Sequence, residues 1–279
     1  MRRLHTLAFA LAVAATTTLS FASQPAPKSE GKPTTPDGKP TTPQGKPTTP
    51  DGKPTTPQGK PTTPDGKPTT PDGKPTNPDI KQIIADLSER GGRVTADVKR
   101  PDQPIITVDL HRATVGDAEL AYLKWFPETL TLDLSYTKIT DAGLVHLAGL
   151  SKLKRLALHG TAITDAGLAQ VAKLTTLETL FLAETAITDA GLAHLAGLSE
   201  LEGLELDQTK ISDAGLKHLA GLTKLKRLEL GRTAISDAGL VHLRGLKKLA
   251  TLDLFRTKVT KAGVEQLQKA LPTTRITAF

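Results

Sequence analysis

Apolar residues recur with a period of 24 residues through the C-terminal two-thirds of the chain. In one such unit, Leu156 and Leu158 alternate with other residues, which predicts a short strand with inward-facing leucines. Leu168, Val171 and Leu174 follow at intervals of three, which predicts a helix with one apolar face. A fixed period of this length is typical of a solenoid, in which each unit buries its apolar side against its neighbours.

The phrase Thr-x-Ile-[Thr/Ser]-Asp-Ala-Gly-Leu joins each predicted strand to its helix. We expect its first Thr to satisfy buried backbone groups at the turn. Either the second Thr (or Ser) or the Asp after it should cap the helix, where an acidic residue also suits the helix dipole. The Asp residues of the five exact copies have the same neighbours as one another, so none is singled out for catalysis; the copy at Asp117 is looser. The Asp recurs at Asp117, Asp141, Asp165, Asp189, Asp213 and Asp237, and Lys261 replaces it in the last unit.

One unit contains Leu153, Leu156, Leu158, Thr161 and Ile163 at the spacing L-x-x-L-x-L-x-x-N/C-x-L. With this pattern, residues 105–272 resemble the leucine-rich repeat superfamily, in particular exported bacterial proteins with tandem Ile-Thr-Asp-Ala-Gly-Leu units. They are also similar to the ribonuclease-inhibitor-like, cysteine-containing subclass, although Thr stands where that subclass has Cys. The resemblance implies an α/β fold: a right-handed solenoid of about seven strand-helix units, with a parallel concave sheet and convex helices. It also implies protein binding as the usual activity, but no particular partner.

The segments that flank the repeats should cover the ends of the solenoid, whose first and last apolar layers need shielding from water. Residues 79–104 are predicted to form an N-terminal helix-strand cap, with Asp79 at the start of the helix and a strand over 93–98. Ile80, Ile83, Ile84 and Leu87 supply the apolar face of that helix. Residues 273–279 are expected to form a C-terminal capping strand.

The first residues are typical of a signal peptide. Arg2 and Arg3 precede an apolar stretch, and Ser20-Phe21-Ala22 offers small residues for cleavage after residue 22. An uncleaved membrane anchor is the alternative, but the stretch is short against the roughly 20 apolar residues of a membrane span. We expect export to the periplasm, the cell surface or the medium, with no membrane span after cleavage.

Residues 23–78 are predicted to be a disordered linker. Seven heptads of the form Gly-Lys-Pro-Thr-Thr-Pro-[Asp/Gln] occupy most of it, with the last copy varied, and they contain no apolar residue larger than Pro. Frequent Pro favours an extended spacer. Two interpretations stay open: a stalk, whose Thr pairs resemble O-glycosylated sequences, or a linker with no specific partner.

Composition excludes several kinds of site. The chain has no Cys, which rules out disulfides, thiolate metal sites and a Cys nucleophile. The formal net charge of +7 divides into +2 for residues 1–22, +3 for 24–78 and +2 for 79–279, with both signs mixed in the last segment. That mixture argues against nucleic-acid binding. No phosphate loop, HExxH or G-x-S-x-G is present, so we expect no enzyme activity, no cofactor and no metal site.

Strand residues between the inward leucines should face outward on the concave sheet, where they vary while the framework does not. The mid-strand positions are mainly acidic, and stacked Glu205, Glu229 and Asp253 should repel one another unless a cation intervenes. This favours a basic partner; the alternative is a solvated acidic face balanced by Arg232 and Arg256. The predicted partner-binding residues are Asp109, Asp133, Tyr136, Phe181, Glu205, Glu229, Arg232, Asp253, Phe255 and Arg256.

The aromatic residues of this set are Tyr136, Phe181 and Phe255. We expect them to point at water, as binding anchors do. A second periodic set, His146, His194, His218 and His242, should lie on the outward side of the helices, too widely spaced to share a metal.

Two functions are compatible with these patterns. The first is an exported, monomeric, non-enzymatic module that recognises a protein, or another ligand, through its concave face at the end of an extended tether. The second is a structural spacer of the cell envelope with no specific ligand.

Overall fold

The computed structural model describes residues 79–96 and 105–279. The predicted signal peptide (1–22), the predicted linker (23–78) and residues 97–104 of the predicted N-terminal cap lie outside the described residues. Within the described ranges, none of the helices combines the length and the apolar character that a membrane span requires.

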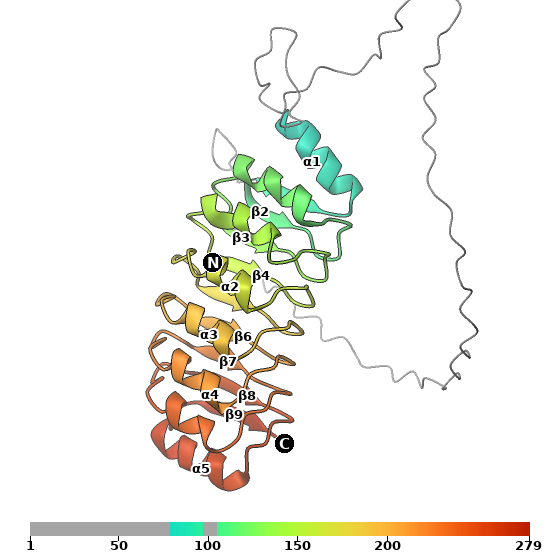
Figure 1. Ribbon diagram of the computed structural model, residues 1–279. Coiled ribbons are helices and arrows are strands. Elements are labelled where there is room, and N and C mark those ends of the chain that lie inside the picture. The colour runs from blue at the N-terminus through green and yellow to red at the C-terminus, as the bar shows by residue number, and fades with distance from the viewer. Residues whose placement is uncertain (1–78, 97–104) are drawn as a thin grey trace, which may run out of the picture. The chain divides into compact units, whose positions relative to one another are not determined.

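The described residues form one sheet whose strands lie side by side in chain order (Figure 1). β1 pairs antiparallel with β2, and every later pair is parallel. A parallel pair needs a crossover between its strands, and each 24-residue unit supplies one. The strands are β1 (Arg93–Ala96), β2 (Ile105–Asp109), β3 (Thr131–Asp133), β4 (Arg155–Ala157), β5 (Thr179–Phe181), β6 (Gly203–Glu205), β7 (Arg227–Glu229), β8 (Thr251–Leu254) and β9 (Arg275–Ala278).

A helical segment follows each of the strands β2 to β8, which gives seven strand-helix units and confirms the predicted α/β solenoid. The segment is α-helical in some units and a tighter 3₁₀ helix in others. The helical segments are α1 (Ile80–Glu89), η1 (Asp117–Trp125), η2 (Gly143–Gly149), α2 (Asp165–Val171), α3 (Asp189–Leu195), α4 (Asp213–Leu216), η3 (Lys217–Leu219), η4 (Gly239–Leu243) and α5 (Lys261–Ala270).

The core lies between the sheet and the helical segments and consists mainly of leucine. Leu156 and Leu158 are fully buried, as the alternation predicts, and so are their counterparts in the neighbouring units. Leu168, Val171 and Leu174 of the helical side are buried against them. The core is continuous from unit to unit, so each repeat depends on its neighbours for burial.

The repeated turn Thr is structural, as predicted. Thr161 is buried, and its hydroxyl donates a hydrogen bond of 2.6 Å to the carbonyl of Leu158 in the same unit. Thr137, Thr185, Thr209, Thr233 and Thr257 make the equivalent bond. The hydroxyl therefore pairs a carbonyl at the end of the strand in each unit; in the last unit the Leu254 carbonyl also accepts from the backbone N–H of Thr257 at 3.2 Å.

The repeated Asp is not the helix cap; the Thr or Ser before it is. Thr164 caps α2, because its side chain accepts from the backbone N–H of Ala166. Asp165 turns away from its own helix and accepts two hydrogen bonds from Thr188 of the next unit, one from the backbone N–H and one from the hydroxyl. The same pairing joins Asp117 to Thr140, Asp141 to Thr164, Asp189 to Ser212, Asp213 to Ser236 and Asp237 to Thr260.

The glycine of the motif makes room for this pairing. A Cβ atom on Gly191 would clash with the Oδ1 of Asp165, and the glycines of the other units face the preceding Asp in the same way. The motif therefore combines a capping hydroxyl, an Asp that binds the next unit, and a glycine that accepts the Asp of the preceding unit. We call this Asp-to-Thr/Ser connection the inter-repeat clasp.

The N-terminal helix α1 begins at Ile80, where the Asp79 side chain accepts from the backbone N–H of Lys81 at 2.9 Å. Ile83 and Leu87 are buried and join the common core. β1 follows after a turn in which Gly91 has a φ of 93°, a conformation that favours glycine. At the other end, β9 completes the sheet beside β8.

Candidate functional site

One face of the sheet points away from the leucine core, and we call it the open face; it is the face predicted to be concave. The strand register aligns the mid-strand residues of neighbouring units directly beside one another. We call this line the central row. It consists of Asp109, Asp133, Ala157, Phe181, Glu205, Glu229 and Asp253.

The carboxylates at the N-terminal end of the central row are used by their own strands. Asp109 Oδ1 accepts from the backbone N–H of His111 at 3.1 Å, and Asp133 Oδ1 accepts from that of Ser135 at 2.8 Å. His111 Nδ1 also lies 3.9 Å from Asp133 Oδ2. These Asp side chains hold the turn after the strand and have internal partners.

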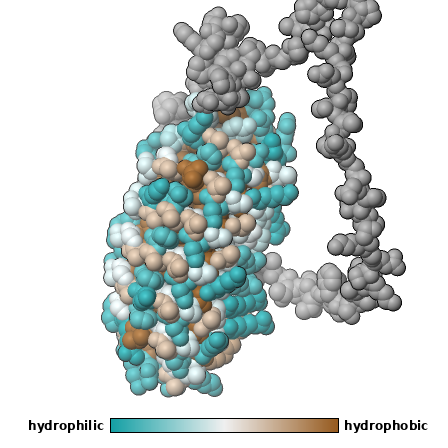
Figure 2. Space-filling view, in the orientation of Figure 1, coloured by the Kyte–Doolittle hydropathy of each residue, from teal (hydrophilic) through white to brown (hydrophobic). Residues whose placement is uncertain are grey.

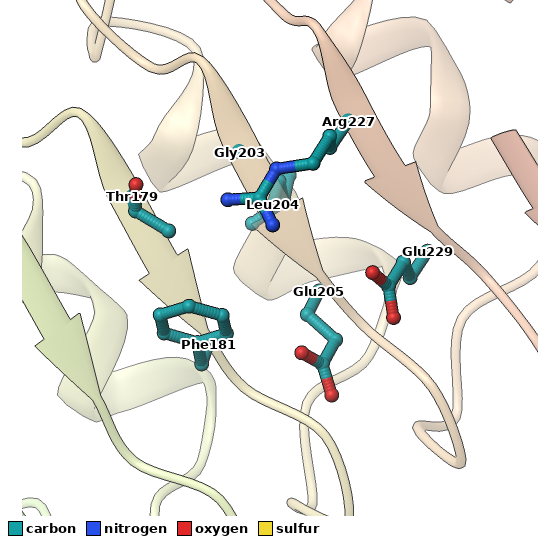
Figure 3. Close-up of a pocket in the computed structure, with 7 residues that line it drawn as sticks. All are labelled: Thr179, Phe181, Gly203, Leu204, Glu205, Arg227 and Glu229. Carbon is teal, nitrogen blue, oxygen red and sulfur yellow. The ribbon is translucent and has the colours of Figure 1, made fainter. Parts of the chain in front are cut away.

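Phe181 stands in the middle of the central row between basic and acidic neighbours. The guanidinium carbon of Arg155 lies 5.5 Å from the centre of the Phe181 ring, and the His159 ring lies 5.3 Å away. Glu205 on the next strand borders the ring on its other side (Figure 3). The Phe181 ring is therefore partly buried, which differs from the expectation that it points at water.

The other two predicted aromatic residues are more exposed. Tyr136 is 42% exposed and Phe255 is 37% exposed. The Tyr136 hydroxyl lies 3.3 Å from Glu184 Oε1, and Arg112 lies over its ring at 5.3 Å. Arg256 lies over the Phe255 ring at the same distance of 5.3 Å. The structure thus places an aromatic side chain near each end of the open face and a less exposed one in the middle.

Carboxylates accumulate on β6 to β8. Neither Glu205 nor Glu229 accepts a hydrogen bond from a described residue, although His159 Nδ1 lies 3.6 Å from Glu205 Oε1. Asp253 accepts from the backbone N–H of Phe255 at 2.8 Å. Asp207, two residues beyond Glu205, has a buried Oδ2 with no hydrogen-bond partner among the described residues. This end of the row therefore carries negative charge that the described residues leave largely uncompensated.

Burial and mutual repulsion change the acidity of these groups. Burial, reinforced by the charge of Glu229, raises the pKa of Glu205 to about 7. Burial, again reinforced by Glu229, raises the pKa of Asp207 to about 6. The pKa of Glu229 is raised by burial and by Asp253, and burial lowers the pKa of His159. The charge of this surface therefore changes within the range from pH 5 to pH 8.

Arg232 and Arg256, which were expected to balance the acidic residues of the central row, contact other side chains. Arg232 donates a hydrogen bond of 3.2 Å to Gln208 Oε1, and Arg256 is placed over Phe255. Arg227, from the start of β7, instead extends over Gly203 beside Glu205 and Glu229 (Figure 3). The partner-binding residues predicted from the sequence include neither Arg227 nor Asp207, although the sequence places Asp207 beside the central row. The period of two along a strand could have found them, because they lie two residues before and after central-row positions.

The open face is hollowed in two adjoining places. The first hollow lies between β5 and β7 and is bordered by Phe181, Glu205, Arg227 and Glu229 (Figure 3). The second continues towards β9, where Asp253 and Arg275 border it. Glu229 lines both hollows, and each hollow combines carboxylates with one arginine, Arg227 in the first and Arg275 in the second.

Cation binding has one geometric candidate in the described part of the chain. Oxygen atoms of Glu205, Asp207 and Glu229 lie within 4.8 Å of one another, and carboxylate oxygens are the ligands that Ca²⁺ prefers. Exposed acidic groups are also common without an ion, so spacing alone does not assign a metal. The periodic histidines on the helical side form no such group among the described residues.

The opposite side of the molecule has a different surface. Figure 2 shows hydrophobic residues scattered among hydrophilic ones on the visible face. The exposed Val145 of η2 and Val241 of η4 are separate hydrophobic residues on the helical segments. Isolated exposed apolar residues of this kind are normal on a protein surface.

Comparison with known proteins identifies the repeat. A sequence-family profile described as "Leucine Rich repeat" matches residues 127–148 and 221–243. The structure is similar to internalin C2 of Listeria monocytogenes, with 26% identity and a TM-score of 0.51, over 63% of this chain and 81% of that one. No curated protein matches the chain by sequence.

Two further similarities have lower TM-scores. The internalin inlF of Listeria monocytogenes is 26% identical over 57% of this chain and 50% of that one, with a TM-score of 0.45. A leucine-rich repeat protein of Leptospira interrogans is 27% identical over 57% of this chain and 38% of that one, with a TM-score of 0.46. This chain therefore spans half or less of the length of these two proteins.

Proposed function

This chain is a leucine-rich repeat protein, and on that premise we propose that it is an exported, non-enzymatic recognition module that binds a protein through its open face. One observation carries the proposal. The buried framework is nearly the same in every unit, whereas the central row changes along the stack, from Asp through Ala157 and Phe181 to Glu and finally Asp253. A constant scaffold with a variable outer row is the arrangement by which a repeat array distinguishes partners.

The polar residues that repeat have structural tasks, which supports a binding role over catalysis. Each Asp of the motif is paired in a clasp, as Asp165 is with Thr188, and each turn Thr is paired with a strand carbonyl, as Thr161 is with Leu158. Side chains of the open face such as Glu205 and Phe181 take no part in these bonds. Exposed aromatic residues such as Tyr136 and Phe255, set among charged groups, are typical anchors of protein interfaces.

Export and presentation on a tether complete the proposal. Both are supported by the signal-like residues 1–22 and the heptads of residues 23–78. The module would stand away from its point of attachment and meet its partner as a monomer. Its partner is a protein, and nucleic acid is not expected, because residues 79–279 carry only a small net charge with mixed signs.

The test is capture of a partner from a cell-envelope extract, with the exported chain as bait. We expect one protein to be retained by the wild-type chain at physiological salt and lost in the double variant F181S/F255S. The matched control is V145S/V241S, which changes two exposed apolar residues of the helical side, 50% and 47% exposed, and should retain the partner. No capture by the wild-type chain would favour the structural spacer, and equal loss in both variants would refute the placement on the open face.

A further inference from the structure

We propose that the free edge of β9 binds an extended segment of the partner protein as an additional β-strand, with apolar side chains of that segment on the side of the leucine core. This inference rests on the proposed function, because the segment belongs to the protein that the open face recognises. It adds a second surface, the edge of the sheet, to that function.

The backbone of β9 is hydrogen-bonded on one side only. β9 is the last strand of the sheet (Figure 1), and the N–H of Arg275 donates a hydrogen bond of 2.8 Å to the Ala250 carbonyl. Backbone groups alternate in direction along a strand, so the N–H and C=O groups of Ile276 and Ala278 point away from β8. These groups have no backbone partner among the described residues. A strand edge of this kind is a template for pairing with another chain.

The two edges of the sheet differ in how regular they are. At the N-terminal edge, the register of β1 shifts between Thr95 and Ala96, and β1 also contacts helix α1. Irregularities of this kind protect an edge from pairing. β9 pairs with β8 in regular register at all four residues, and it contains neither Pro nor Lys. The C-terminal edge therefore lacks the features that commonly prevent strand addition.

The last apolar layer of the core is incompletely covered. Ile276 and Ala278 pack against the core but are only partly buried. Their counterparts on β8, Leu252 and Leu254, have β9 beside them and are 1% and 0% exposed. Phe279, directly after β9, is 62% exposed. A segment with apolar residues at alternate positions would bury this layer as the inner strands bury theirs.

On its other side, β9 continues the open face. Arg275 and Thr277 line the second hollow together with Glu229 and Asp253. A segment paired with β9 would therefore lie beside the surface that we propose for the partner.

The length of the edge favours this partner over a second copy of the chain. A specific interface buries about 800 Å² on each side, and a four-residue strand edge is short for that purpose. A partner already held by the open face can add the edge as a second contact, because the first contact raises the local concentration of the segment.

The test is NMR-detected hydrogen exchange of the purified full-length chain with a defined probe. The probe is a synthetic peptide with the sequence of residues 202–208, in which leucines alternate with polar residues as they do in β6. In the free chain we expect fast exchange of the Ile276 and Ala278 amides and slow exchange of the Thr277 amide, which faces β8. Saturating peptide should slow the exchange of Ile276 and Ala278 at least about tenfold, and that of Thr277 much less.

Two N-methylated peptides are the matched controls. One lacks the N–H groups of Leu204 and Leu206, and the other lacks those of Gly203 and Glu205. A strand pairs with a single edge through alternate residues, so only one of the two peptides should lose the protection of β9, and its identity gives the direction of the added strand. Equal loss or equal retention in both would overturn pairing through the backbone.

Two further results would overturn the proposal. The first is no protection by the unmethylated peptide at about 1 mM. The second is protection of Ile276 and Ala278 that rises with the concentration of the chain alone, which would identify a second copy as the occupant.

The capture experiment separates the two proposals. The variant F181S/F255S should lose the captured partner and keep the protection by the peptide, because neither residue belongs to β9. Capture by the wild-type chain without protection at β9 overturns the added strand alone. Protection without capture overturns the recognition function and keeps the pairing at the edge.

Discussion

Asp165 accepts two hydrogen bonds from Thr188 of the next unit, one from the backbone N–H at 2.8 Å and one from the hydroxyl at 2.5 Å. The Thr188 hydroxyl in turn accepts from the N–H of Ala190 and so caps α3. One carboxylate therefore orients the residue that starts the next helix. The clasp couples the start of one helix to the start of the next, and the six clasps form a line along the stack.

Removing one clasp should weaken the stack. The variant D165A leaves the partly buried N–H of Thr188 without its acceptor, and we expect the free energy of unfolding to fall by about 1–3 kcal/mol. Urea denaturation of the purified chain measures this. Lys261 holds the same position in the last unit, and it accepts no such bond, so K261A should change stability by less than about 0.5 kcal/mol. Equal effects of the two variants would show that the clasp adds nothing.

The glycine that accepts the clasp gives a second prediction. In G191A the new Cβ would clash with Asp165 Oδ1, so the variant should lose about 1–3 kcal/mol even though Ala is the better helix former. G197A is the control, because a Cβ there meets no atom within 4 Å and the backbone is not left-handed. It should leave stability unchanged or raise it slightly. Thermal unfolding of both variants would reveal the contrast.

The turn Thr allows an isosteric test. T185V removes the hydroxyl that donates 2.6 Å to the Leu182 carbonyl but keeps the shape of the buried side chain. We expect a loss of about 1 kcal/mol in the free energy of unfolding, because the carbonyl loses its partner. T185S keeps the donor and should retain most of this contribution. If T185V were as stable as the wild-type chain, the bond between the turn Thr and the strand carbonyl would contribute nothing to stability.

Stability should depend on pH through the open face. The folded-state pKa values of about 7 for Glu205 and about 6 for Asp207 lie above the usual values near 4, so the folded chain binds more protons than the unfolded chain between them. The contribution of these two groups to the free energy of unfolding is fully present below about pH 4, and it is lost as the pH rises through 6 and 7. We expect the free energy of unfolding to be higher at pH 5.5 than at pH 8, by an amount on the order of 1 kcal/mol because both groups are partly solvated.

A variant isolates this effect. E205Q/E229Q removes two of the interacting carboxylates and should flatten the difference between pH 5.5 and pH 8. D109N/D133N should preserve it, because those groups lie at the other end of the row. Chemical denaturation at the two pH values is the measurement. An unchanged difference in the free energy of unfolding in E205Q/E229Q would contradict the assignment of the pH dependence to these carboxylates.

Asp237 acts in the opposite direction. Its hydrogen bonds from Thr260 lower its pKa, so its contribution to the free energy of unfolding is lost only in stronger acid.

Some features of the open face could be predicted from the sequence and others could not. The central row could be predicted because all units have the same length, so Glu205 and Glu229 had to fall side by side. The exposure and the bonding partners of each side chain could not be predicted. Phe181 is partly covered because Arg155 and His159 of the preceding unit lie against it. Arg232 pairs with Gln208 rather than with the acidic row. These outcomes depend on the direction and length of side chains on adjacent strands.

By itself, the sequence determined the repeat, the alternation of buried and exposed positions and the line of residues on the open face. These follow from local periodicity and from the need of each short unit to bury its leucines. Only the tertiary structure decided which polar groups meet. Asp165 and Thr188 are 23 residues apart, and within its own unit Asp165 is simply an acidic residue in the first turn of α2. Stacking brings the Thr188 N–H and hydroxyl within reach, and a carboxylate takes the two donors that three-dimensional packing places before it.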